Sequence, residues 1–517
     1  MQVYTQIKKD TYMDSLAALL LSSMMGEEEG IETAYAGMAT QGAKNSLREL
    51  GMLTEEVMQA GDQDLFLVAR ASSEEAFLLA VKKAGTFAEG SRETMEKKAV
   101  YTTIDQAVRA NPAANICTIA VPGEYAFETT KQALQNGLHC IVFSNHVPLS
   151  EERKMKELAR EKGLLCMGPD CGVANINGAA FVLSSINNRG PVGICGASGC
   201  GIQHVAAFLH QAGSGVSQTI GTGGNDLKEE VGGITMLMGI DALEQDPDTE
   251  FIVLISRKPS DKVCASVLER VKQCSKKVVV CFLGADRKQV EEAGAIYARD
   301  LDDCVLKTLQ LVGSDFSFES EEEIERLAEE AVSRMSREQR YVRGIYCGGT
   351  YCDEAMEALE EEIGPIYSNC PLREEWKLED SFVSRENCVI DAGEEEFTQG
   401  KPHPTLEPSM RLPLIRKEGE DLSTAVILLD FILTPPANSD PAGVTLETLR
   451  EAIRKSEERG GRIAVVASVL GTDADLQNVT RQRETLRKAG VYVMKSNRQA
   501  AKLAARIIKK KECKLRT

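Results

Sequence analysis

Short apolar runs alternate with amphipathic stretches along most of the chain. The runs 251–256 and 277–283 are almost wholly apolar, which is typical of buried parallel strands. Stretches with helical periodicity, such as 202–211, follow runs of this kind. Because strands that alternate with helices build parallel sheets, the pattern predicts an α/β protein with a mostly parallel, doubly wound sheet.

The pattern also divides the chain into four segments. Residues 1–185 and 186–315 continue the alternation of strands and helices. Residues 316–340 are heavily charged and helical, and we expect them to form a linker whose charges face solvent. Residues 341–517 begin a third set of strands and helices, and the irregular, proline-rich loop 370–424 within it is long enough to be functional.

Composition and charge exclude several kinds of partner. The chain has 517 residues, enough for about three or four domains, and its net charge of −18 argues against a general nucleic-acid or anionic-membrane binder. Its 15 cysteines are scattered without zinc spacing, so we predict buried thiols, no metal site and a reducing, cytoplasmic location. The apolar run 16–25 lies between acidic residues, which favours an amphipathic helix over a signal peptide.

A glycine-rich turn after a short apolar strand is the strongest candidate for chemistry. The turn and the helix that follows it contain Gly196, Ser198, Gly199, Gly201 and Ile202. Backbone N–H groups at a helix N-terminus attract anions, and a serine there suits an N-cap or a donor to phosphate. We therefore predict that these five residues bind a phosphate or carboxylate. The alternative is a tight turn that serves packing, with the serine as a plain N-cap.

A second glycine loop follows the next predicted strand and contains Gly223, Gly224, Asn225 and Asp226. Loops from neighbouring parallel strands face each other at the carboxyl edge of a sheet, which is the usual ligand position in open α/β folds. Asn225 and Asp226 are candidates to orient an amide substrate. The alternative is that their side chains only form the turn. The sequence leaves open whether Gly348 and Gly349 bind a further ligand or pair with the first half of the chain.

Three segments resemble the α subunit of succinyl-CoA synthetase in their order and spacing. They are Gly168-Pro-Asp-Cys-Gly172, Gly196-Ala-Ser-Gly199 and Gly221-Thr-Gly-Gly-Asn-Asp226, and the resemblance covers about residues 100–312. It implies a Rossmann-like CoA-binding-type domain in the first segment of the chain. It also implies flavodoxin-like succinyl-CoA-ligase-type domains with parallel sheets in the second segment and in the last.

The whole chain is similar to the FdrA branch of that family. The similarity rests on the Gly-Glu-Tyr-Ala turn at 123–126, on Val231-Gly-Gly233 and on the loop Gly400-Lys-Pro-His-Pro404. It implies a carbamoyltransferase subunit of the oxamate carbamoyltransferase type, acting with other subunits in an oligomer. Such a protein moves a carbamoyl group between oxalurate and phosphate in ureide and purine breakdown, giving carbamoyl phosphate and oxamate.

The sequence departs from the ligase family at two places. The family phosphorylates a histidine directly before an Ala-Gly-Ala-Ile run, whereas this chain has Glu292 before Ala293-Gly-Ala-Ile296. A carboxylate cannot replace imidazole as a stable phosphoryl carrier of that kind, so Glu292 is a candidate general base or a residue without a role. The glycine-rich CoA loop is also missing, because the corresponding turn is Lys8-Lys-Asp-Thr-Tyr12. Phosphate or carbamoyl phosphate is therefore the expected ligand, and CoA is a further possibility.

Two residues of the long loop, Lys401 and His403, are candidates to bind a substrate carboxylate, with a structural or interface role as the alternative. Two other functions stay open for the whole chain. An acyl-CoA synthetase without the phosphohistidine would bind CoA and form a thioester at the expense of ATP. A non-catalytic scaffold or sensing subunit would bind a metabolite and a catalytic partner. The retained anion turn and the missing histidine favour the carbamoyltransferase.

Overall fold

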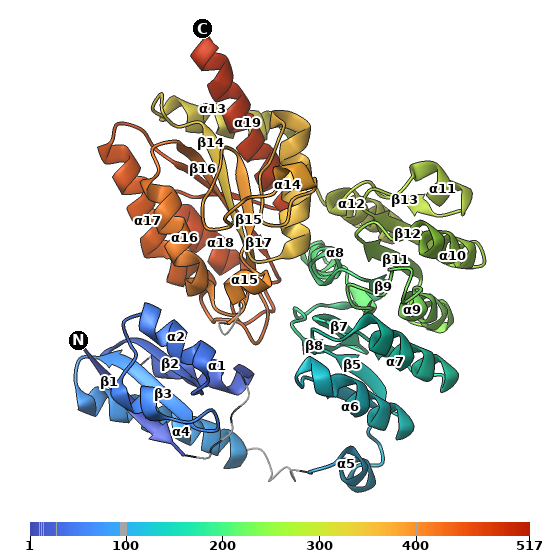
Figure 1. The fold of residues 1–517 in the computed structure, drawn as a ribbon. Coiled ribbons are helices and arrows are strands. Elements are labelled where there is room, and N and C mark those ends of the chain that lie inside the picture. The colour runs from blue at the N-terminus through green and yellow to red at the C-terminus, as the bar shows by residue number, and fades with distance from the viewer. Residues whose placement is uncertain are drawn as a thin grey trace. The chain divides into compact units, whose positions relative to one another are not determined.

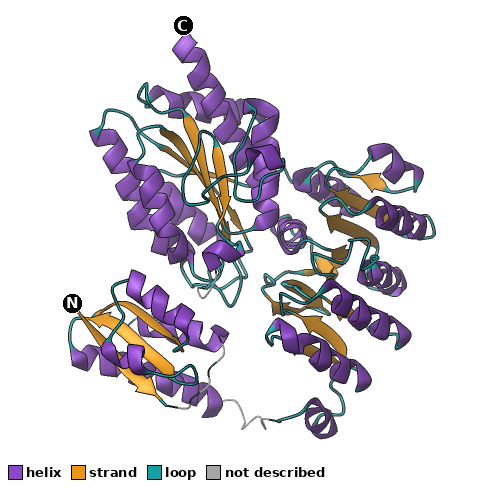
Figure 2. Cartoon of the chain, in the orientation of Figure 1, coloured by secondary structure: helices purple, strands orange, loops and turns teal. Residues whose placement is uncertain are grey.

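The computed structural model describes the chain as two compact units. The first unit comprises Met1–Tyr101 and Ala392–Met410, and the second comprises Thr102–Asp391 and Arg411–Thr517. Figures 1 and 2 show the helices and strands of both units. The described residues are 1–9, 11, 13, 15–26, 28–93, 101–398 and 402–516.

The first unit is built around an antiparallel sheet in the order β1-β3-β2. Its strands are β1 (Gln2–Lys8), β2 (Ile31–Met38) and β3 (Leu65–Ala71). Its helices are α1 (Ser15–Gly26), α2 (Gln41–Glu49), α3 (Glu55–Gln59), α4 (Glu74–Glu93) and α15 (Glu395–Thr398). Alternate residues of the central strand β3 enter two separate apolar clusters, so both faces of the sheet are covered.

This unit corrects the prediction of a single parallel, Rossmann-like domain over residues 1–185. Strand β3 lies between β1 and β2 and runs antiparallel to both. An alternation of strands and helices does not by itself specify strand direction, because a strand can enter the sheet between two earlier ones. Residues 102–185 lie in the second unit instead.

The second unit begins with a small parallel sheet in the order β4-β5-β6. Its strands are β4 (Ile116–Ile119), β5 (His139–Val142) and β6 (Cys166–Met167). The helices of this part are α5 (Ile104–Ala110), α6 (Gly123–Gln135) and α7 (Leu149–Glu161). Here the parallel pairing agrees with the prediction from the alternating pattern.

A seven-stranded sheet follows, in the order β13-β12-β11-β9-β10-β7-β8. Strands β9 to β13 are parallel, and β7 and β8 form an antiparallel hairpin at one edge. The strands are β7 (Val173–Ile176), β8 (Ala179–Val182), β9 (Arg189–Gly196), β10 (Val216–Gly221), β11 (Phe251–Ser256), β12 (Lys277–Phe282) and β13 (Ile296–Tyr297). The helices are α8 (Gly199–Gln211), α9 (Ile234–Gln245), α10 (Asp261–Val271), α11 (Arg287–Glu292) and α12 (Leu301–Val312). Because the hairpin belongs to this sheet, the sheet begins at residue 173 and not after the predicted boundary at 185.

The last sheet has five parallel strands in the order β15-β14-β16-β17-β18. They are β14 (Tyr341–Tyr346), β15 (Cys388–Asp391), β16 (Thr424–Ile432), β17 (Ala464–Leu470) and β18 (Tyr492–Met494). The helices are α13 (Glu321–Ser333), α14 (Gly349–Ile363), α16 (Leu412–Glu420), α17 (Pro441–Glu458), α18 (Val479–Lys488) and α19 (Asn497–Arg516). Figure 1 shows α14 and α19 on one face of the sheet and α16 and α17 on the opposite face.

The two large sheets share one topology. Their parallel strands, numbered along the chain within each sheet, both have the order second, first, third, fourth, fifth. This is the flavodoxin-like order, so the prediction of flavodoxin-like domains is confirmed. In such a sheet the ligand position lies at the carboxyl end of the first strand, where the order reverses. Those first strands are β9 and β14, and helices α8 and α14 begin directly after them.

One continuous apolar core connects the two sheets. Helices α8 and α14 pack against each other. Val205 and Phe208 of α8 belong to the same buried cluster as Ala355 and Leu359 of α14. The second unit therefore holds the carboxyl ends of β9 and β14 in a fixed relation.

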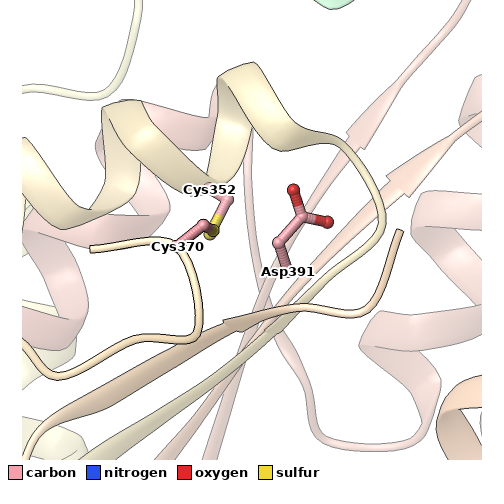
Figure 3. Close-up of side chains that lie close together, drawn as sticks. All are labelled: Cys352, Cys370 and Asp391. Carbon is pink, nitrogen blue, oxygen red and sulfur yellow. The ribbon is translucent and has the colours of Figure 1, made fainter. Parts of the chain in front are cut away.

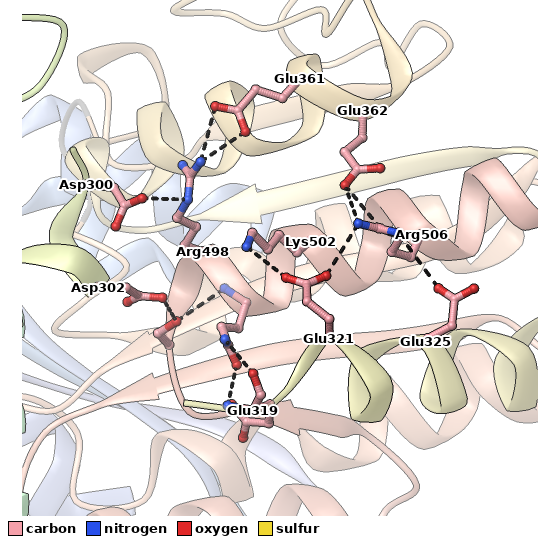
Figure 4. A network of polar contacts seen from close by, with 12 residues as sticks. Asp300, Asp302, Glu319, Glu321, Glu325, Glu361, Glu362, Arg498, Lys502 and Arg506 are labelled. Atoms are coloured by element: carbon pink, nitrogen blue, oxygen red, sulfur yellow. Dashed lines mark hydrogen bonds and ion pairs between the residues drawn. The ribbon is translucent and has the colours of Figure 1, made fainter. Parts of the chain in front are cut away.

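The segments predicted as a linker and as an irregular loop are more ordered than expected. Helix α13, within the predicted linker 316–340, packs its apolar side chains against α19. Glu321 of α13 pairs with Lys502 at 3.3 Å and with Arg506 at 3.4 Å (Figure 4). The predicted loop 370–424 contains β15, α15, α16 and two short 3-10 helices, Glu374–Trp376 and Pro408–Arg411. Over the described residues, every helix is too short or too polar to serve as a membrane span.

A buried lysine fastens α7 to the loop that follows β10. The ammonium group of Lys156 is fully buried and donates to Glu152 at 2.7 Å, to the carbonyl of Thr222 at 2.8 Å and to Asp226 at 2.8 Å. Burial lowers the pKa of Lys156, but the two carboxylates outweigh this effect, and the net shift is upward. The small sheet is therefore attached to the seven-stranded sheet by a buried ion triad.

We expect the substitution Lys156→Met to destabilise the second unit strongly. Removing one partner of a buried ion pair leaves uncompensated charge and costs about 3–5 kcal/mol. Denaturant unfolding followed through Trp376, which lies in this unit, measures the change in the free energy of unfolding. The matched control is Lys154→Met, an exposed lysine of the same helix. Equal unfolding midpoints for the two variants would contradict the structural role of Lys156.

Candidate functional site

The N-terminal turns of α8 and α14 meet within the second unit. Ser198, the N-cap of α8, and Thr350, the second residue of α14, are joined by a hydrogen bond of 2.9 Å between their hydroxyl oxygens. Both residues are buried. We call residues 198–201 and 348–351 the paired helix termini. They bring together two segments that are about 150 positions apart in the chain.

The turn at α8 leaves the N–H groups of Gly199 and Cys200 without acceptors among the described residues. The Ser198 hydroxyl oxygen accepts the N–H of Gly201 at 3.0 Å, and the Ser198 carbonyl accepts the N–H of Ile202 at 2.9 Å. The predicted backbone donors at 201 and 202 are therefore already used inside the turn. Gly199 is partly exposed, and among the described residues its N–H donates to no acceptor. An anion at this terminus would bind the N–H of Gly199.

Some backbone N–H groups of the turn at α14 donate to a carboxylate of the same sheet. Asp430 of β16 accepts the N–H groups of Cys347 at 2.9 Å and Gly348 at 3.0 Å. Arg411 donates to the same carboxylate at 3.0 Å. The next residue, Gly349, is partly exposed, and its N–H has no acceptor among the residues described. Gly349 is therefore the partly exposed residue of this turn with an available N–H group.

A cation lies beside the same turn. Arg257 follows β11 and pairs with Asp353 through a contact of 2.7 Å. A Cβ atom added to Gly349 would lie 3.1 Å from the guanidinium of Arg257 and 2.9 Å from the carboxylate of Asp391. Only glycine fits at 349 without displacing these groups. The turn is thus bordered by one guanidinium and by carboxylates.

The predicted glycines of the first turn divide into two kinds. A Cβ atom on Gly196 would lie 2.8 Å from the carbonyl oxygen of Ile255, and one on Gly201 would lie 2.7 Å from the Ile255 side chain. Close packing therefore accounts for both glycines. A Cβ atom on Gly199 would meet nothing closer than Val173 at 3.4 Å, an ordinary contact distance. Packing does not explain the glycine at 199, a position with an available N–H group.

The two glycine loops lie side by side, as their neighbouring strands require. Gly221 pairs with Gly196 across β10 and β9, and Thr222 donates its N–H to the carbonyl of Gly196 at 2.8 Å. Gly223 has a positive φ of 84°, and a Cβ atom there would overlap the carbonyl of Pro169. Gly223 therefore serves the junction with the Gly168–Gly172 segment, while Gly224 is exposed.

Asp226 has no oxygen left for a substrate. The residue is fully buried, and one oxygen binds Lys156 at 2.8 Å and the N–H of Thr235 at 3.2 Å. The other oxygen accepts the N–H of Met236 at 2.9 Å. The structure therefore corrects the prediction that Asp226 orients a substrate, because the carboxylate caps α9 and completes the ion triad. Asn225 beside it is partly exposed.

The remaining predicted site residues are Glu292, His403 and Lys401. Glu292 ends α11 with a side chain that is 64% exposed, and its ion-pair partner is Lys288 at 3.8 Å. This surface position does not support the prediction of Glu292 as a catalytic base. His403 belongs to the first unit, where its Nδ1 accepts the N–H of Thr405 at 3.2 Å. Lys401 lies outside the described residues.

Thr350 and Arg257 are site residues that the sequence analysis did not single out. The signal for Thr350 is its position after Gly348 and Gly349 at the end of an apolar strand. The signal for Arg257 is its position directly after the buried strand β11. Side chains at the carboxyl ends of neighbouring parallel strands meet at one edge, but only the structure brings the two sheets together at this edge.

A buried polar cluster underlies the paired helix termini. His204 of α8 contacts the hydroxyl of Tyr351 at 2.6 Å and Asp302 at 3.2 Å. Glu354, one turn further along α14, accepts a hydrogen bond from Asn497 at 2.8 Å. Burial, with the nearby Asp302 carboxylate as the second cause, raises the pKa of Glu354 to about 8. Glu354 is therefore protonated at neutral pH.

Three family models match separate parts of the chain. Residues 345–507 match the model described as CoA-ligase, and residues 187–284 match the model described as CoA binding domain. Residues 1–102 match the model described as AllF, heavy metal-associated domain. The CoA-binding match covers β9, α8 and β11 and not the first segment of the chain, where the sequence analysis expected a domain of this kind.

The chain is 40% identical to YahF of Escherichia coli (strain K12) over 518 residues, which cover 99% of this chain and 100% of YahF. It is 28% identical over 204 residues to subunit alpha 1 of the ADP-forming succinate–CoA ligase of Archaeoglobus fulgidus, and these cover 38% of this chain and 68% of that subunit. The crystal structure of PH0766 from Pyrococcus horikoshii OT3 matches with a TM-score of 0.32 and 13% identity, covering 81% of this chain and 88% of that one.

The segment that matches a heavy metal-associated domain lacks two kinds of soft-metal ligand. Soft metals select thiolate, thioether or imidazole ligands. The first cysteine of the chain is Cys117 and the first histidine is His139, so residues 1–101 offer neither a thiolate nor an imidazole. Methionine thioethers are therefore the soft-metal donors that residues 1–101 contain.

We expect Glu354→Gln to stabilise the protein in alkaline solution. The carboxyl group ionises near pH 4.5 in the unfolded chain and near pH 8 in the folded one, so its contribution to stability falls as the pH rises between these values. The amide cannot ionise. The melting temperature of the variant should therefore exceed that of the unaltered protein at about pH 8.5, and the difference should shrink towards about pH 5.5.

The control for this measurement is Glu447→Gln, an exposed glutamate of α17. It should leave the dependence of the melting temperature on pH unchanged. A difference between Glu354→Gln and the unaltered protein that stays constant from acid to alkaline pH would contradict the protonated, buried state of Glu354.

Proposed function

Because the chain belongs to the FdrA-like family that includes YahF, we propose that it catalyses acyl transfer to or from a phosphate group held at the paired helix termini. The chain is acyl-CoA-synthetase-like, with regions related to CoA ligases and to the alpha subunit of succinate–CoA ligase. The observation that carries the proposal is the buried contact between Ser198 and Thr350. It places two helix N-termini together, each at the switch point of a flavodoxin-like sheet.

The paired helix termini offer the donors that a phosphate needs. The N–H groups of Gly199 and Gly349 are partly exposed, and each helix dipole favours negative charge at its N-terminus. The hydroxyls of Ser198 and Thr350 share one hydrogen bond, which uses one of their two hydrogens, so the pair adds one adaptable donor between the helices. The guanidinium of Arg257 supplies positive charge beside Gly349. These groups would hold a phosphate and stabilise the charge that develops as an acyl group enters or leaves it.

The proposed chemistry does not pass through a phosphohistidine. The residue before the Ala-Gly-Ala-Ile run is Glu292, and its side chain lies on the surface. His204, on α8, is fully buried against Tyr351 and Asp302. A chain of this kind needs a substrate that already contains an activated acyl group, or an acyl phosphate that forms directly in the site.

Carbamoyl transfer is a specific reaction that meets this requirement, and we propose it as the reaction of this chain. A phosphate oxygen attacks the carbamoyl carbon of oxalurate and the bond from that carbon to the amide nitrogen breaks. The proton of the attacking phosphate passes to the leaving nitrogen, so the products are carbamoyl phosphate and oxamate. No ATP and no phosphorylated protein are required. The absence of the histidine favours this reaction over ATP-driven thioester formation.

Thioester formation with CoA is the second candidate, and the match of residues 187–284 to a CoA binding domain favours it. An acid, ATP and CoA would give a thioester that can be detected directly. Oxalurate with phosphate would instead give carbamoyl phosphate. We further propose that other subunits contribute acid–base groups, because Asp226 and Glu292 are not placed to supply them.

We expect Ser198→Ala to weaken the binding of phosphate and of carbamoyl phosphate. A hydrogen bond to a charged group contributes about 1.5–3 kcal/mol, so the dissociation constant should rise by about tenfold or more. Isothermal titration of the full chain measures it. The control is Ser266→Ala, an exposed serine of α10. Unchanged phosphate affinity in Ser198→Ala would overturn the proposed site.

We expect Glu292→Gln to leave transfer activity within about twofold of the unaltered protein, because substitutions of exposed side chains rarely change stability or function. Turnover of oxalurate and phosphate, with any partner subunits present, is followed by phosphorus NMR. A large loss of turnover in Glu292→Gln would contradict this prediction. Acid-labile labelling of the chain by γ-labelled ATP would do the same, and either result would favour a ligase mechanism with a phosphorylated residue.

A further inference from the structure

Two thiols and a carboxylate come together beside the paired helix termini. Cys352, Cys370 and Asp391 each offer one ligand atom, and these atoms lie within 4.8 Å of one another (Figure 3). Cys352 and Asp391 are buried and Cys370 is half-buried. We propose that these three side chains bind a thiophilic divalent cation of the Zn²⁺ class.

The three ligands come from a helix, a strand and the segment between them. Cys352 lies in the first turn of α14, and Asp391 is the last residue of β15. Asn369 donates its amide to the carbonyl of Asp391 at 3.0 Å and accepts the N–H of Asp391 at 2.9 Å. This pair of hydrogen bonds holds the neighbouring residue, Cys370, beside the end of β15. The positions of the ligands are therefore set by α14, by β15 and by the hydrogen bonds between the Asn369 side chain and the Asp391 backbone.

The donor set matches the chemistry of zinc. Zn²⁺ binds thiolates and carboxylates in tetrahedral sites, and sites with three protein ligands keep a fourth position for water or substrate. A thiol that coordinates a cation loses its proton. Binding would release protons and draw the three side chains together.

The site adjoins the proposed phosphate position, and this consequence rests on the proposed function. A Cβ atom on Gly349 would lie 2.9 Å from the Asp391 carboxylate, so that carboxylate borders the N-terminus of α14. With two thiolates and one carboxylate as ligands, a dication leaves the site with one negative charge overall, so a phosphate would be held by direct coordination to the cation and not by net charge. The open fourth position would then accept an oxygen of the substrate. Cation binding itself depends only on the three ligands.

The sequence does not reveal this site, because the spacing of the three ligands along the chain matches no zinc-binding motif. The three ligands are separated by 17 and 20 intervening residues, far from the short spacings that mark zinc fingers and ribbons. All 15 cysteines lie in the second unit, because residues 1–101 and 392–410 contain none. A metal–thiolate signal from the full chain can therefore be assigned to the second unit.

Titration of the reduced, full-length chain with Co²⁺ tests the proposal. We expect one ion per chain and the charge-transfer absorption of a cobalt–thiolate bond, which Zn²⁺ then displaces. Cys352→Ser and Asp391→Asn should each weaken binding by at least about tenfold, whereas Cys370→His should keep it, because imidazole is also a zinc ligand. The control is Cys117→Ser, a half-buried thiol elsewhere in the unit. Far-ultraviolet circular dichroism verifies that each variant is folded.

Three results would overturn the proposal. They are the lack of a cobalt–thiolate band in the reduced chain, an equal loss of that band in Cys117→Ser, and a stable Cys352–Cys370 disulfide that takes up no metal after reduction. Phosphate binding by the metal-free chain separates this proposal from the proposed function. If Ser198→Ala weakens phosphate binding and the chain binds no cation, the metal-site proposal is refuted and the proposed function is not.

Discussion

Two helix N-termini meet in the second unit, and this contact constrains the rest of the structure. Each terminus carries about half a positive charge, so their approach is unfavourable unless polar groups compensate it. The hydroxyls of Ser198 and Thr350 bridge the two turns, and Asp430 accepts two N–H groups at the start of α14. The contact still leaves N–H groups at Gly199 and Gly349 without acceptors among the described residues. A bound anion would complete the compensation.

The surrounding structure holds this contact in place. The common apolar core of the two sheets fixes α8 against α14, and Arg498 of α19 pairs with Asp300 at 3.1 Å and with Glu361 at 3.0 Å (Figure 4). Asp300 is the N-cap of α12, and Glu361 lies on α14. Arg498 therefore links α12 of the seven-stranded sheet and α14 of the five-stranded sheet to α19. The site is built on rigid elements, as a preorganised binding site requires.

The sequence predicted the part of the site that local pattern determines. The strand, the glycine turn and the cap at Ser198 follow from residues that are adjacent in the chain, and the structure places Ser198 at the N-terminus of α8. The partner Thr350 was not predictable, because no local signal specifies which surface of the second sheet meets the first. The prediction that Asp226 orients a substrate was wrong for a related reason. Its ion-pair partner Lys156 is 70 residues away in the chain, so the pair is visible only in the structure. The flavodoxin-like sheets were predicted correctly, whereas the direction of β3 was not, because alternation of elements leaves strand order open.

A double-mutant cycle of Ser198→Ala and Thr350→Val, measured as the change in the free energy of phosphate binding, tests the central claim most directly. If both hydroxyls contact one phosphate between the helix termini, the two losses should be non-additive, with a coupling of about 0.5–3 kcal/mol. The coupling should appear in phosphate binding and not only in the stability of the metabolite-free protein. Strictly additive losses, or no loss in either variant, would mean that the two termini do not share a phosphate.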